Sequence, residues 1–335
     1  MSIMKHKRQI QTELFLDKIK DEIHILSLYC YLDELMKKCI NMRKYDIEKI
    51  KGAFFIDLIN NKNLDKQITI LEKNAHEKNC DIKIDKDNSY KIISITFTVF
   101  NNNGINYYKY FVKYIHESKM QTQIINTSLL EKNVIYLSKN KENIGTILLI
   151  YHVLGLNTGL FWGFVPDICI YFENKYKNNI IECFASPFNH SLQKFYSILY
   201  NLDKDYGSQG DFFSRFLEDD YLINMINPPW TSELLIKTNE YIIKKLKKSK
   251  CVIYLYVPEW KDIYDPFYEQ LVTLSETNNY KIRRNILKSR ESYTYDYMNS
   301  IKIVTTFNTL LFMIHNVEAY DESDYDKLLE SFLIK

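Results

Sequence analysis

Apolar residues in the first part of the chain recur at helical spacing, at every third or fourth position. The pattern runs through residues 9–42, 46–59 and 64–76 and predicts amphipathic helices there. A different pattern follows at Tyr90–Ile115, where β-branched and aromatic residues flank an Asn-Gly pair. It predicts two strands, or a strand and a helix, around a turn. We expect a mainly helical N-terminal domain over residues 1–140.

From about Lys141 onward, helical and strand-like patterns alternate. The helical segments are Thr146–Leu154, Leu192–Leu202, Ser232–Lys248 and Pro266–Thr277. The strand-like segments are Asn179–Phe184, Tyr221–Ile226, Cys251–Val257 and Ile301–His315. Strands that alternate with helices indicate a doubly wound α/β sheet, which binds its ligands at the carboxyl ends of the strands. We expect such a domain over residues 141–335.

Composition narrows the class of protein only a little. Hydrophobic residues make up 46% of the chain and charged residues 26%, as is ordinary for a soluble globular protein. The net charge of +2 neither favours nor excludes a nucleic-acid partner, because such a site needs only a local basic patch. The chain has 27 tyrosines and only 8 glycines, and it is rich in Lys, Asn and Ile. This bias indicates an A+T-rich genome.

The cysteines and the N-terminus favour an intracellular protein. No CxxC pair and no His pair at zinc spacing accompanies the six cysteines, so neither a disulfide framework nor a metal site is expected. These cysteines, which we expect to be reduced and mostly buried, are Cys30, Cys39, Cys80, Cys169, Cys183 and Cys251. No signal peptide is evident, and no apolar run reaches the roughly 20 residues that a membrane span needs. We expect a cytoplasmic or nuclear location without a membrane partner.

Asn227-Pro228-Pro229-Trp230 follows the predicted strand Tyr221–Ile226, where a sheet ligand would bind. An exocyclic adenine amine is a poor nucleophile, because its lone pair is delocalised into the ring. The Asn227 side-chain oxygen and the Pro228 carbonyl would accept its hydrogens, while the prolines stiffen the turn. Trp230 would stack on the adenine, a contact worth about 1–3 kcal/mol. Taken alone, the four residues also fit an ordinary turn that ends a strand, and glutamine methyltransferases share the pattern.

Further motifs accompany this one in a fixed order. They are ECFASPFNH (Glu182–His190), DYGSQGDFF (Asp205–Phe213), INPPWTSELL (Ile226–Leu235), IYLYVPEWKD (Ile253–Asp262) and two closing segments, Ile282–Tyr297 and Phe307–Asn316. In order and approximate spacing, the chain between Gly163 and Asn316 resembles the cap-specific adenosine N6-methyltransferases related to the phosphorylated-CTD-interacting factor. The resemblance implies a Rossmann-like class I methyltransferase domain preceded by the helical domain.

The implied activity is S-adenosylmethionine-dependent RNA methylation. The enzyme would methylate N6 of the first transcribed (2′-O-methyl)adenosine beside the N7-methylguanosine cap of mRNA, giving m6Am. Trp230 stands where the animal enzymes have phenylalanine, and Thr294 follows Tyr293 where they have arginine. The chain shows no paired tryptophans of a WW module. Together with the short chain and the coding bias, this suggests a viral member that acts in the host cytoplasm.

The resemblance also assigns binding residues. Those that would hold S-adenosylmethionine are Phe184, Ala185, Ser186, Pro187, Asn189, Gly207 and Ser208. Without the family, these segments read as turns, since they lack a GxGxxG pattern. Those that would contact the RNA are Glu259, Trp260, Arg283, Arg284, Arg290 and Tyr293. Trp260 also fits a cap on the core, and the arginines are candidates for phosphate contacts.

Two other functions stay open. One is an internal RNA or DNA adenine N6-methyltransferase. The other is a non-catalytic scaffold of the same fold that binds capped RNA or a protein. Cap specificity requires a pocket for N7-methylguanine, a cation that favours aromatic and acidic surroundings. We expect this pocket between the catalytic domain and the N-terminal half.

Overall fold

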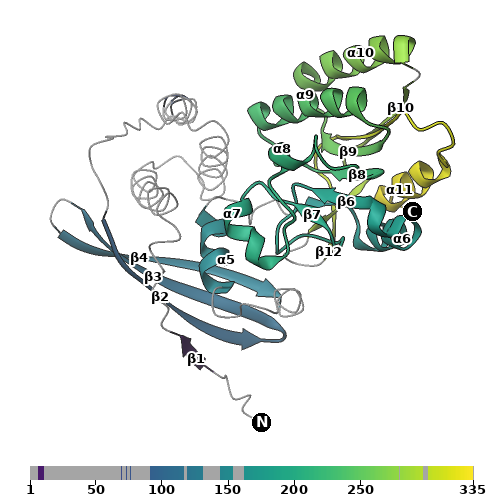
Figure 1. Cartoon of the computed structure of the whole chain (residues 1–335). Helices are drawn as coiled ribbons and strands as arrows, with labels where there is room; N and C mark the ends of the chain where they lie inside the picture. Colours follow the sequence, from purple (N-terminus) through teal and green to yellow (C-terminus); the bar gives the residue numbers. More distant parts are fainter. Residues whose placement is uncertain are drawn as a thin grey trace. The chain divides into compact units, whose positions relative to one another are not determined.

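The computed structural model describes residues 7–10, 69, 73, 76, 91–116, 119–130, 144–153, 162–278, 280–296 and 301–334 (Figure 1). The chain divides into two compact units, Met1–Leu160 and Phe161–Lys335. Helix α5 (Ile144–Val153) contacts strand β4 (Lys119–Leu130) in the first unit. The boundary between the units therefore lies further along the chain than Lys141.

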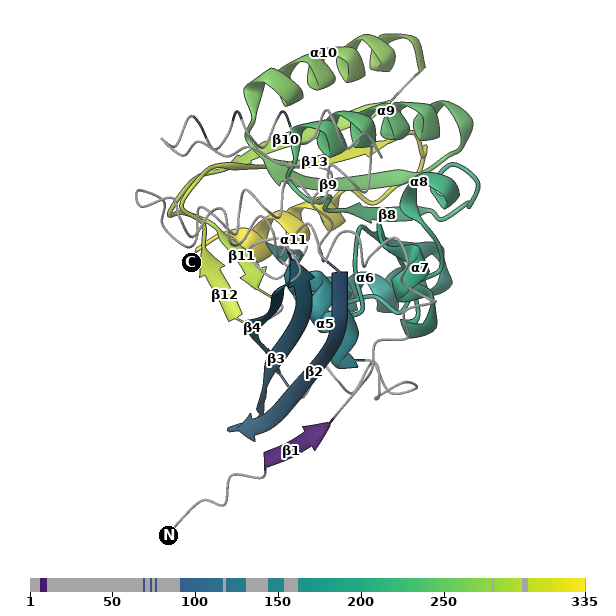
Figure 2. The same ribbon diagram turned by 90° about the vertical axis from the view of Figure 1, so that its left-hand side faces the viewer.

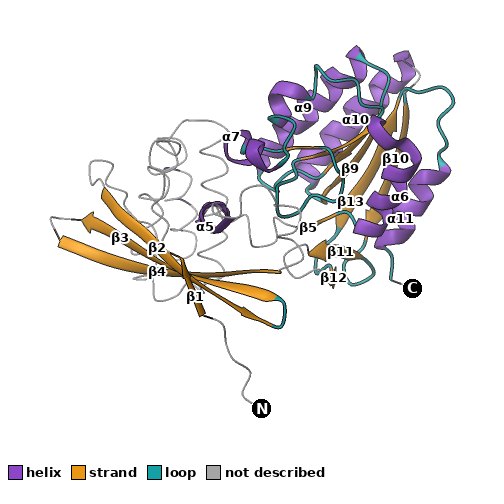
Figure 3. Cartoon of the chain, turned by 60° about the horizontal axis from the view of Figure 1, so that its bottom comes forward, coloured by secondary structure: helices purple, strands orange, loops and turns teal. Residues whose placement is uncertain are grey.

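Besides α5, the described part of the first unit is an antiparallel sheet in the order β1-β2-β3-β4 (Figure 1), whose strands are drawn in orange in Figure 3. Its other strands are β1 (Lys7–Ile10), β2 (Lys91–Asn102) and β3 (Ile105–His116). Asn103 and Gly104 connect β2 to β3, and both have positive φ angles, 53° and 75°. Two-residue hairpins favour this geometry, for which Asn-Gly is the preferred sequence. The predicted pair of strands is confirmed, and the alternative of a strand and a helix is wrong.

The expected helical N-terminal domain is not confirmed. The predicted helices at residues 9–42, 46–59 and 64–76 lie almost wholly outside the described residues, where only Thr69, Lys73 and His76 are seen to be helical. Gln9 and Ile10 belong to β1, so the first prediction is wrong at its start. Among the described residues of this unit, four strands accompany α5 and the three helical residues Thr69, Lys73 and His76.

A six-stranded mixed sheet in the order β10-β13-β9-β8-β6-β7 organises the second unit. Figure 2 shows its strands β10, β13, β9 and β8 in this order. Its strands are β6 (Ile180–Cys183), β7 (Phe195–Tyr196), β8 (Ile223–Ile226), β9 (Val252–Pro258), β10 (Lys281–Leu287) and β13 (Thr309–His315). The strands β7, β6, β8 and β9 are parallel, and β13 pairs antiparallel with both β9 and β10. The expected α/β class is confirmed in this coarse sense.

Helices cover both faces of this sheet. Helices α6 (Pro166–Tyr176) and α11 (Ser323–Phe332) pack on one face, and α9 (Ser232–Lys248) and α10 (Lys261–Asn278) lie on the other (Figure 2). Every residue of β6, β8, β9 and β13 is buried, as expected of strands covered on both sides. Short turns of helix complete the unit: α7 (Tyr200–Asp203), α8 (Phe212–Arg215), and 3-10 turns at Lys177–Asn179 and Lys204–Tyr206.

Most predicted elements of this unit are confirmed, but two need correction. The helix predicted at Leu192–Leu202 is wrong, because its middle forms β7 and only its end enters α7. Pairing with β6 overrides the local helical pattern here. The strand predicted over Ile301–His315 is two strands, β12 (Ile301–Val304) and β13. Strand β12 leaves the main sheet and pairs with β11 (Tyr293–Asp296), which also pairs with β5 (Trp162–Gly163).

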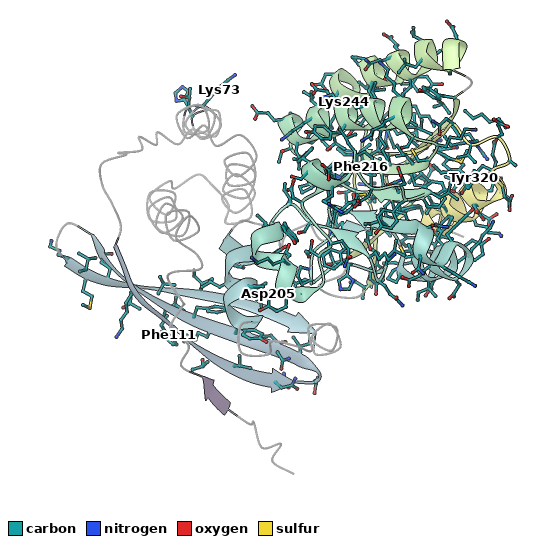
Figure 4. All side chains as sticks on the ribbon, in the orientation of Figure 1. Lys73, Phe111, Asp205, Phe216, Lys244 and Tyr320 are labelled. Atoms are coloured by element: carbon teal, nitrogen blue, oxygen red, sulfur yellow. The ribbon has the colours of Figure 1, made fainter. Side chains whose placement is uncertain are left out.

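A buried carboxylate fastens α11 to α6. The side chain of Asp324 is fully buried and accepts hydrogen bonds from Tyr171 Oη at 2.9 Å, from Lys175 Nζ at 2.7 Å and from Tyr176 Oη. Tyr320, labelled in Figure 4 beside α11, approaches the same carboxylate at 3.4 Å. A buried charge is tolerated only when it is paired and hydrogen-bonded. We therefore expect this cluster to contribute strongly to the stability of the packing between α11 and α6.

We expect Asp324→Ala to lower the free energy of unfolding by about 3 kcal/mol, because Lys175 and the tyrosines lose the carboxylate that accepts their hydrogen bonds. Asp321 is the matched control. It also pairs with Lys175, at 3.0 Å, but its side chain is 57% exposed. Asp321→Ala should cost much less, because an ion pair that is exposed to solvent contributes little. Urea-induced unfolding measures both losses, and equal losses would contradict the assignment of Asp324 as the fastening group.

Candidate functional site

Asn227 directly follows β8, the strand between β6 and β9 in the parallel part of the sheet. Its side-chain Nδ2 donates a hydrogen bond to the main-chain carbonyl of Trp162. Its Oδ1 is buried and has no hydrogen-bond partner among the residues that the structure describes. A buried acceptor left without a donor is costly and therefore rare in folded proteins. Thr231 Oγ1 and Tyr256 Oη, close to the same turn, are also buried without a partner among the described residues.

The residues after Asn227 form a tight, buried turn into α9. Pro228 and Pro229 are both buried, and the Pro229 carbonyl accepts the N–H of Thr231 at 2.9 Å. Thr231 then precedes the first turn of α9. Because proline fixes its own φ angle, the turn is rigid, and it holds Asn227 at the end of β8.

Four aromatic rings form a connected group that includes Trp230 and Trp162, the residue whose carbonyl Asn227 contacts. Trp230 is half-buried and packs edge-on against Tyr256 and Phe307, with ring centroids 6.0 and 5.4 Å away. Phe307 in turn lies nearly parallel to Trp162, at 6.1 Å and 15°. The sequence predicted Trp230 but missed Trp162 and Phe307. Both come from segments outside the parallel strands. In the sequence they appear only as single aromatic residues, which do not by themselves indicate a site.

The segment after β6 makes a closed, buried loop. Phe184 has φ of 64°, in the left-handed region that a bulky residue rarely adopts, and its ring packs on Phe212 at 4.1 Å. Such a conformation costs on the order of 1–3 kcal/mol and persists only where the surroundings hold it. The next residue, Ala185, donates its N–H to the Tyr196 carbonyl of β7 at 3.0 Å. The strained residue therefore sits where β6 ends.

Ser186 and Asn189 stabilise this loop from within. Asn189 Oδ1 accepts hydrogen bonds from the Ser186 N–H at 2.6 Å and from Ser186 Oγ at 2.7 Å, and Ser186 Oγ accepts the N–H of Phe188 at 3.2 Å. Pro187 between them is buried. These polar atoms are already engaged, so any ligand here would meet mainly the backbone of the loop.

The second predicted cofactor segment lies along β7. Gln209 donates its N–H to the Phe195 carbonyl at 2.8 Å, and Ser208 Oγ contacts Ser197 Oγ at 2.9 Å. Gly207 has φ of 106°, a conformation that favours glycine. Since Ala185 also bonds to β7, the structure brings both predicted cofactor segments to the same strand.

Strand order places these segments where ligands of open α/β sheets bind. Strand β6 is flanked by β7 on one side and by β8 on the other, so the chain reverses its direction of progress across the sheet between β6 and β8. Such a switch point leaves a crevice at the carboxyl ends of the strands. Phe184 follows β6 and Asn227 follows β8, so the two predicted motifs flank this point.

Glu182 is a buried acid that the sequence motif contained but to which no role was assigned. Its Oε2 accepts the N–H groups of Ser191 and Leu192, at 2.7 and 3.1 Å, and so closes the loop that begins at Phe184. Burial raises the pKa of Glu182 to about 7, the two N–H donors oppose this, and the charge of Glu173 adds to it. Burial also lowers the pKa of the nearby His190, whose ring stacks on Phe195.

Glu259 and Trp260 follow β9 at the same edge of the sheet. Glu259 Oε2 accepts a hydrogen bond from Asn308 Nδ2 at 2.8 Å, and its N–H donates to the Asn308 carbonyl at 3.1 Å. These bonds tie the end of β9 to the loop that carries Phe307. Trp260 is 36% exposed.

Arg283 and Arg284 do not form one basic patch. They are neighbours on β10, so their side chains leave opposite faces of the sheet. Arg283 pairs with Asp326 of α11 at 2.6 Å, and Arg284 pairs with Asp265 of α10 at 2.8 Å. Each arginine already has a carboxylate partner, which weakens its case as a phosphate contact.

Arg290 and Tyr293 lie near the small sheet. Arg290 is exposed, and its N–H donates to the Thr305 carbonyl at 2.8 Å. Tyr293, on β11, is half-buried and lines a groove of about 820 Å³ next to α6 and α11. Other residues that line this groove are Asp167, Tyr171, Lys302, Lys327 and Glu330. The groove therefore combines aromatic rings with side chains of both charges.

Neither a metal-binding cluster nor a membrane-spanning helix is found among the described residues. No group of three or more His, Cys, Asp and Glu side chains among them is placed to hold a metal ion. None of the described helices is both long and apolar enough to cross a membrane. Cys169, Cys183 and Cys251 are buried free thiols, and burial raises the pKa of Cys251 to about 11. The other three cysteines lie outside the described residues.

Comparison with known proteins supports the resemblance. Residues 144–297, slightly less than half of the chain, match the family model described as "Phosphorylated CTD interacting factor 1 WW domain". No curated protein matches the chain. Among solved structures, the crystal structure of wild-type Trm5b from Pyrococcus abyssi is similar at 10% identity, with 75% of this chain and 69% of that chain covered, at a TM-score of 0.27. A likeness at this score carries no argument about fold or function.

We expect Glu182→Gln to change how stability depends on pH. Between pH 4.5 and about 7, the unfolded wild-type chain loses the Glu182 proton while the folded chain keeps it. The contribution of Glu182 to the free energy of unfolding therefore falls by about 3 kcal/mol across this window. Glutamine does not titrate and still accepts both N–H groups. The variant should gain that amount relative to wild type as pH rises.

Urea-induced unfolding at several pH values measures this difference. Glu318→Gln is the control, because the side chain of Glu318 is 91% exposed. A constant difference in unfolding free energy between Glu182→Gln and wild type, from pH 4.5 to 8, would contradict the raised pKa.

Proposed function

We propose that this chain is an S-adenosylmethionine-dependent methyltransferase that acts on N6 of the adenosine next to the cap of mRNA, inside the cell. The observation that carries the proposal is the unpartnered, buried Oδ1 of Asn227 at the end of β8. A buried acceptor that recognises an exocyclic amine needs to be pre-positioned and free of other partners. The match to the phosphorylated-CTD-interacting-factor family model supports the choice of substrate.

The architecture supports a Rossmann-like class I methyltransferase domain. The order of its parallel strands reverses between β6 and β8, which is where such domains bind their ligands. The loop after β6 offers mainly backbone atoms, which suits a methyl donor bound against the main chain. The residues that would hold S-adenosylmethionine are Phe184–Pro187 and Asn189, together with Gly207 and Ser208 along β7. When bound there, S-adenosylmethionine supplies an electrophilic methyl group.

In the proposed reaction, Asn227 Oδ1 accepts an N–H of the adenine N6 amine. This hydrogen bond draws the nitrogen lone pair out of conjugation and directs it toward the donor side of the crevice. Pro228 and Pro229 keep this geometry rigid, so that orientation rather than a metal or a covalent intermediate lowers the barrier. The aromatic rings near Asn227 would hold the adenine by stacking.

The groove next to Tyr293 is our candidate for the cap. N7-methylguanine is a cation, which favours aromatic rings and acids, and its triphosphate favours lysines. Tyr171 and Tyr293 supply rings, Glu330 supplies a carboxylate, and Lys302 lies 5.8 Å from the Tyr293 ring. This assignment places the cap within the second unit, unlike the pocket between the two halves that we expected from the sequence.

Asn227→Ala should lower methyl transfer to adenosine at least tenfold, about 1.4 kcal/mol of barrier, because it removes the acceptor for the reacting amine. Mass spectrometry of nucleosides from an RNA incubated with protein and labelled donor measures the product. Asn174→Ala, at an exposed position on α6, is the matched control and should leave the rate unchanged. If Asn227→Ala keeps more than a tenth of wild-type turnover, Asn227 does not have this role.

The wild-type protein should methylate a capped adenosine-start RNA at least tenfold faster than the same RNA with a 5′ triphosphate, about 1.4 kcal/mol. Tyr293→Ala should reduce this ratio without abolishing methylation of the uncapped RNA, because the cap groove is separate from Asn227. Equal methylation of both RNAs by the wild type would favour the internal-adenosine alternative instead.

A further inference from the structure

The side-chain amide of an asparagine has two faces of opposite character. Its oxygen only accepts hydrogen bonds, and its nitrogen only donates them. At Asn227 the choice between the two orientations is made by Trp162, whose main-chain carbonyl can only accept. Asn227 must therefore turn Nδ2 toward Trp162, which leaves Oδ1 on the other side of the amide.

The Trp162 carbonyl is itself well fixed. Trp162 belongs to β5, where it pairs with Asp296 of β11 while Gly163 pairs with Tyr295. Its indole ring lies against Phe307, which is half-buried and also contacts Trp230. A backbone carbonyl has no hydrogen to donate, and strand pairing prevents the peptide flip that would bring an N–H to its place, so the orientation that it imposes on Asn227 is fixed.

We propose that Trp162 is a positioning residue whose main-chain carbonyl fixes the amide of Asn227, so that the active site presents an acceptor to an exocyclic amine. The inference rests on the proposed function. It also deepens it, because a fixed acceptor selects a base that carries an amine and disfavours one that carries a carbonyl at the same position. The reverse orientation of the amide would present N–H donors and have the opposite preference.

We call the fixing of the Asn227 amide by the Trp162 carbonyl the lock. The variant Asn227→Asp tests whether the site needs this lock or only an oxygen atom at position 227. An ionised carboxylate has oxygens on both sides, so it keeps an acceptor for the amine but places a second one against the Trp162 carbonyl, where the two repel. A protonated carboxyl group restores the donor, because its O–H can bond to the Trp162 carbonyl while its C=O faces the amine. The lock therefore predicts a variant that works better in acid.

The first measurement is the rate of adenosine methylation by the full chain, Asn227→Asp against wild type, from pH 8 to pH 5.5. We expect the variant to be at least tenfold slower at pH 8, with a ratio to wild type that rises as pH falls. Titratable groups on the neighbouring elements are Glu182 and Cys183 on β6, Tyr254 and Tyr256 on β9, Glu259 directly after β9, Glu233 on α9, and Tyr293, Tyr295 and Asp296 on β11. All of these groups are the same in the variant and in the wild type. Their effect on the rate therefore cancels when the rate of the variant is divided by that of the wild type at each pH. A variant that matches wild type at pH 8, or a ratio that does not change with pH, would overturn the proposal.

The second measurement needs no substrate. The melting temperature of Asn227→Asp should lie about 2–4 °C below wild type at pH 8, and this gap should close at pH 5.5. Asn174→Asp, at the exposed position on α6, should show no such closing gap. A gap that is the same at both pH values contradicts the lock. A chain that fails to methylate any adenosine contradicts the proposed function instead, and melting still decides the orientation of Asn227.

Discussion

Parallel pairing of β6, β8 and β9 is the constraint on which the site depends. Parallel strands place all their carboxyl ends at one edge, so residues far apart in the chain meet there. Phe184, Asn227 and Glu259 follow these three strands in turn. These strands are apolar on both faces, so helices must cover each side of the sheet. Parallel strands also need long connections, because the chain must return to the same end of the sheet before each new strand. Those connections carry the loops of the site.

Much of this architecture could be predicted from the sequence, because it depends on the spacing of apolar residues within each segment. The alternation of buried strands and amphipathic helices gave β8, α9 and β9 closely, and the position of Asn227 at a strand end followed from them. Non-local pairing was beyond such patterns. The residues Leu192–Leu202 favour a helix locally, but β6 recruits Phe195 and Tyr196 as a strand.

The errors in the site have the same origin. Trp162 and Phe307 reach Asn227 from segments that precede and follow the parallel strands, so no spacing in the sequence connects them. Arg283 and Arg284 look like a basic cluster when read along the chain. Once the segment is recognised as a strand, the alternation of its side chains separates them, and carboxylates from α11 and α10 neutralise them on opposite faces. A period-2 interpretation of residues 281–287 would have avoided that error.

The position of β13 has a consequence for how the chain assembles. This strand lies between β9 and β10, although it is made after both of them. Until residues 309–315 leave the ribosome, the backbone donors and acceptors of β9 and β10 that β13 will pair have no partner on that side, and the apolar faces around Phe312 are missing from the core. Unpaired strand edges of this kind invite wrong pairing with other chains. The main sheet of the second unit is therefore complete only after its last strand has been inserted between two strands made earlier.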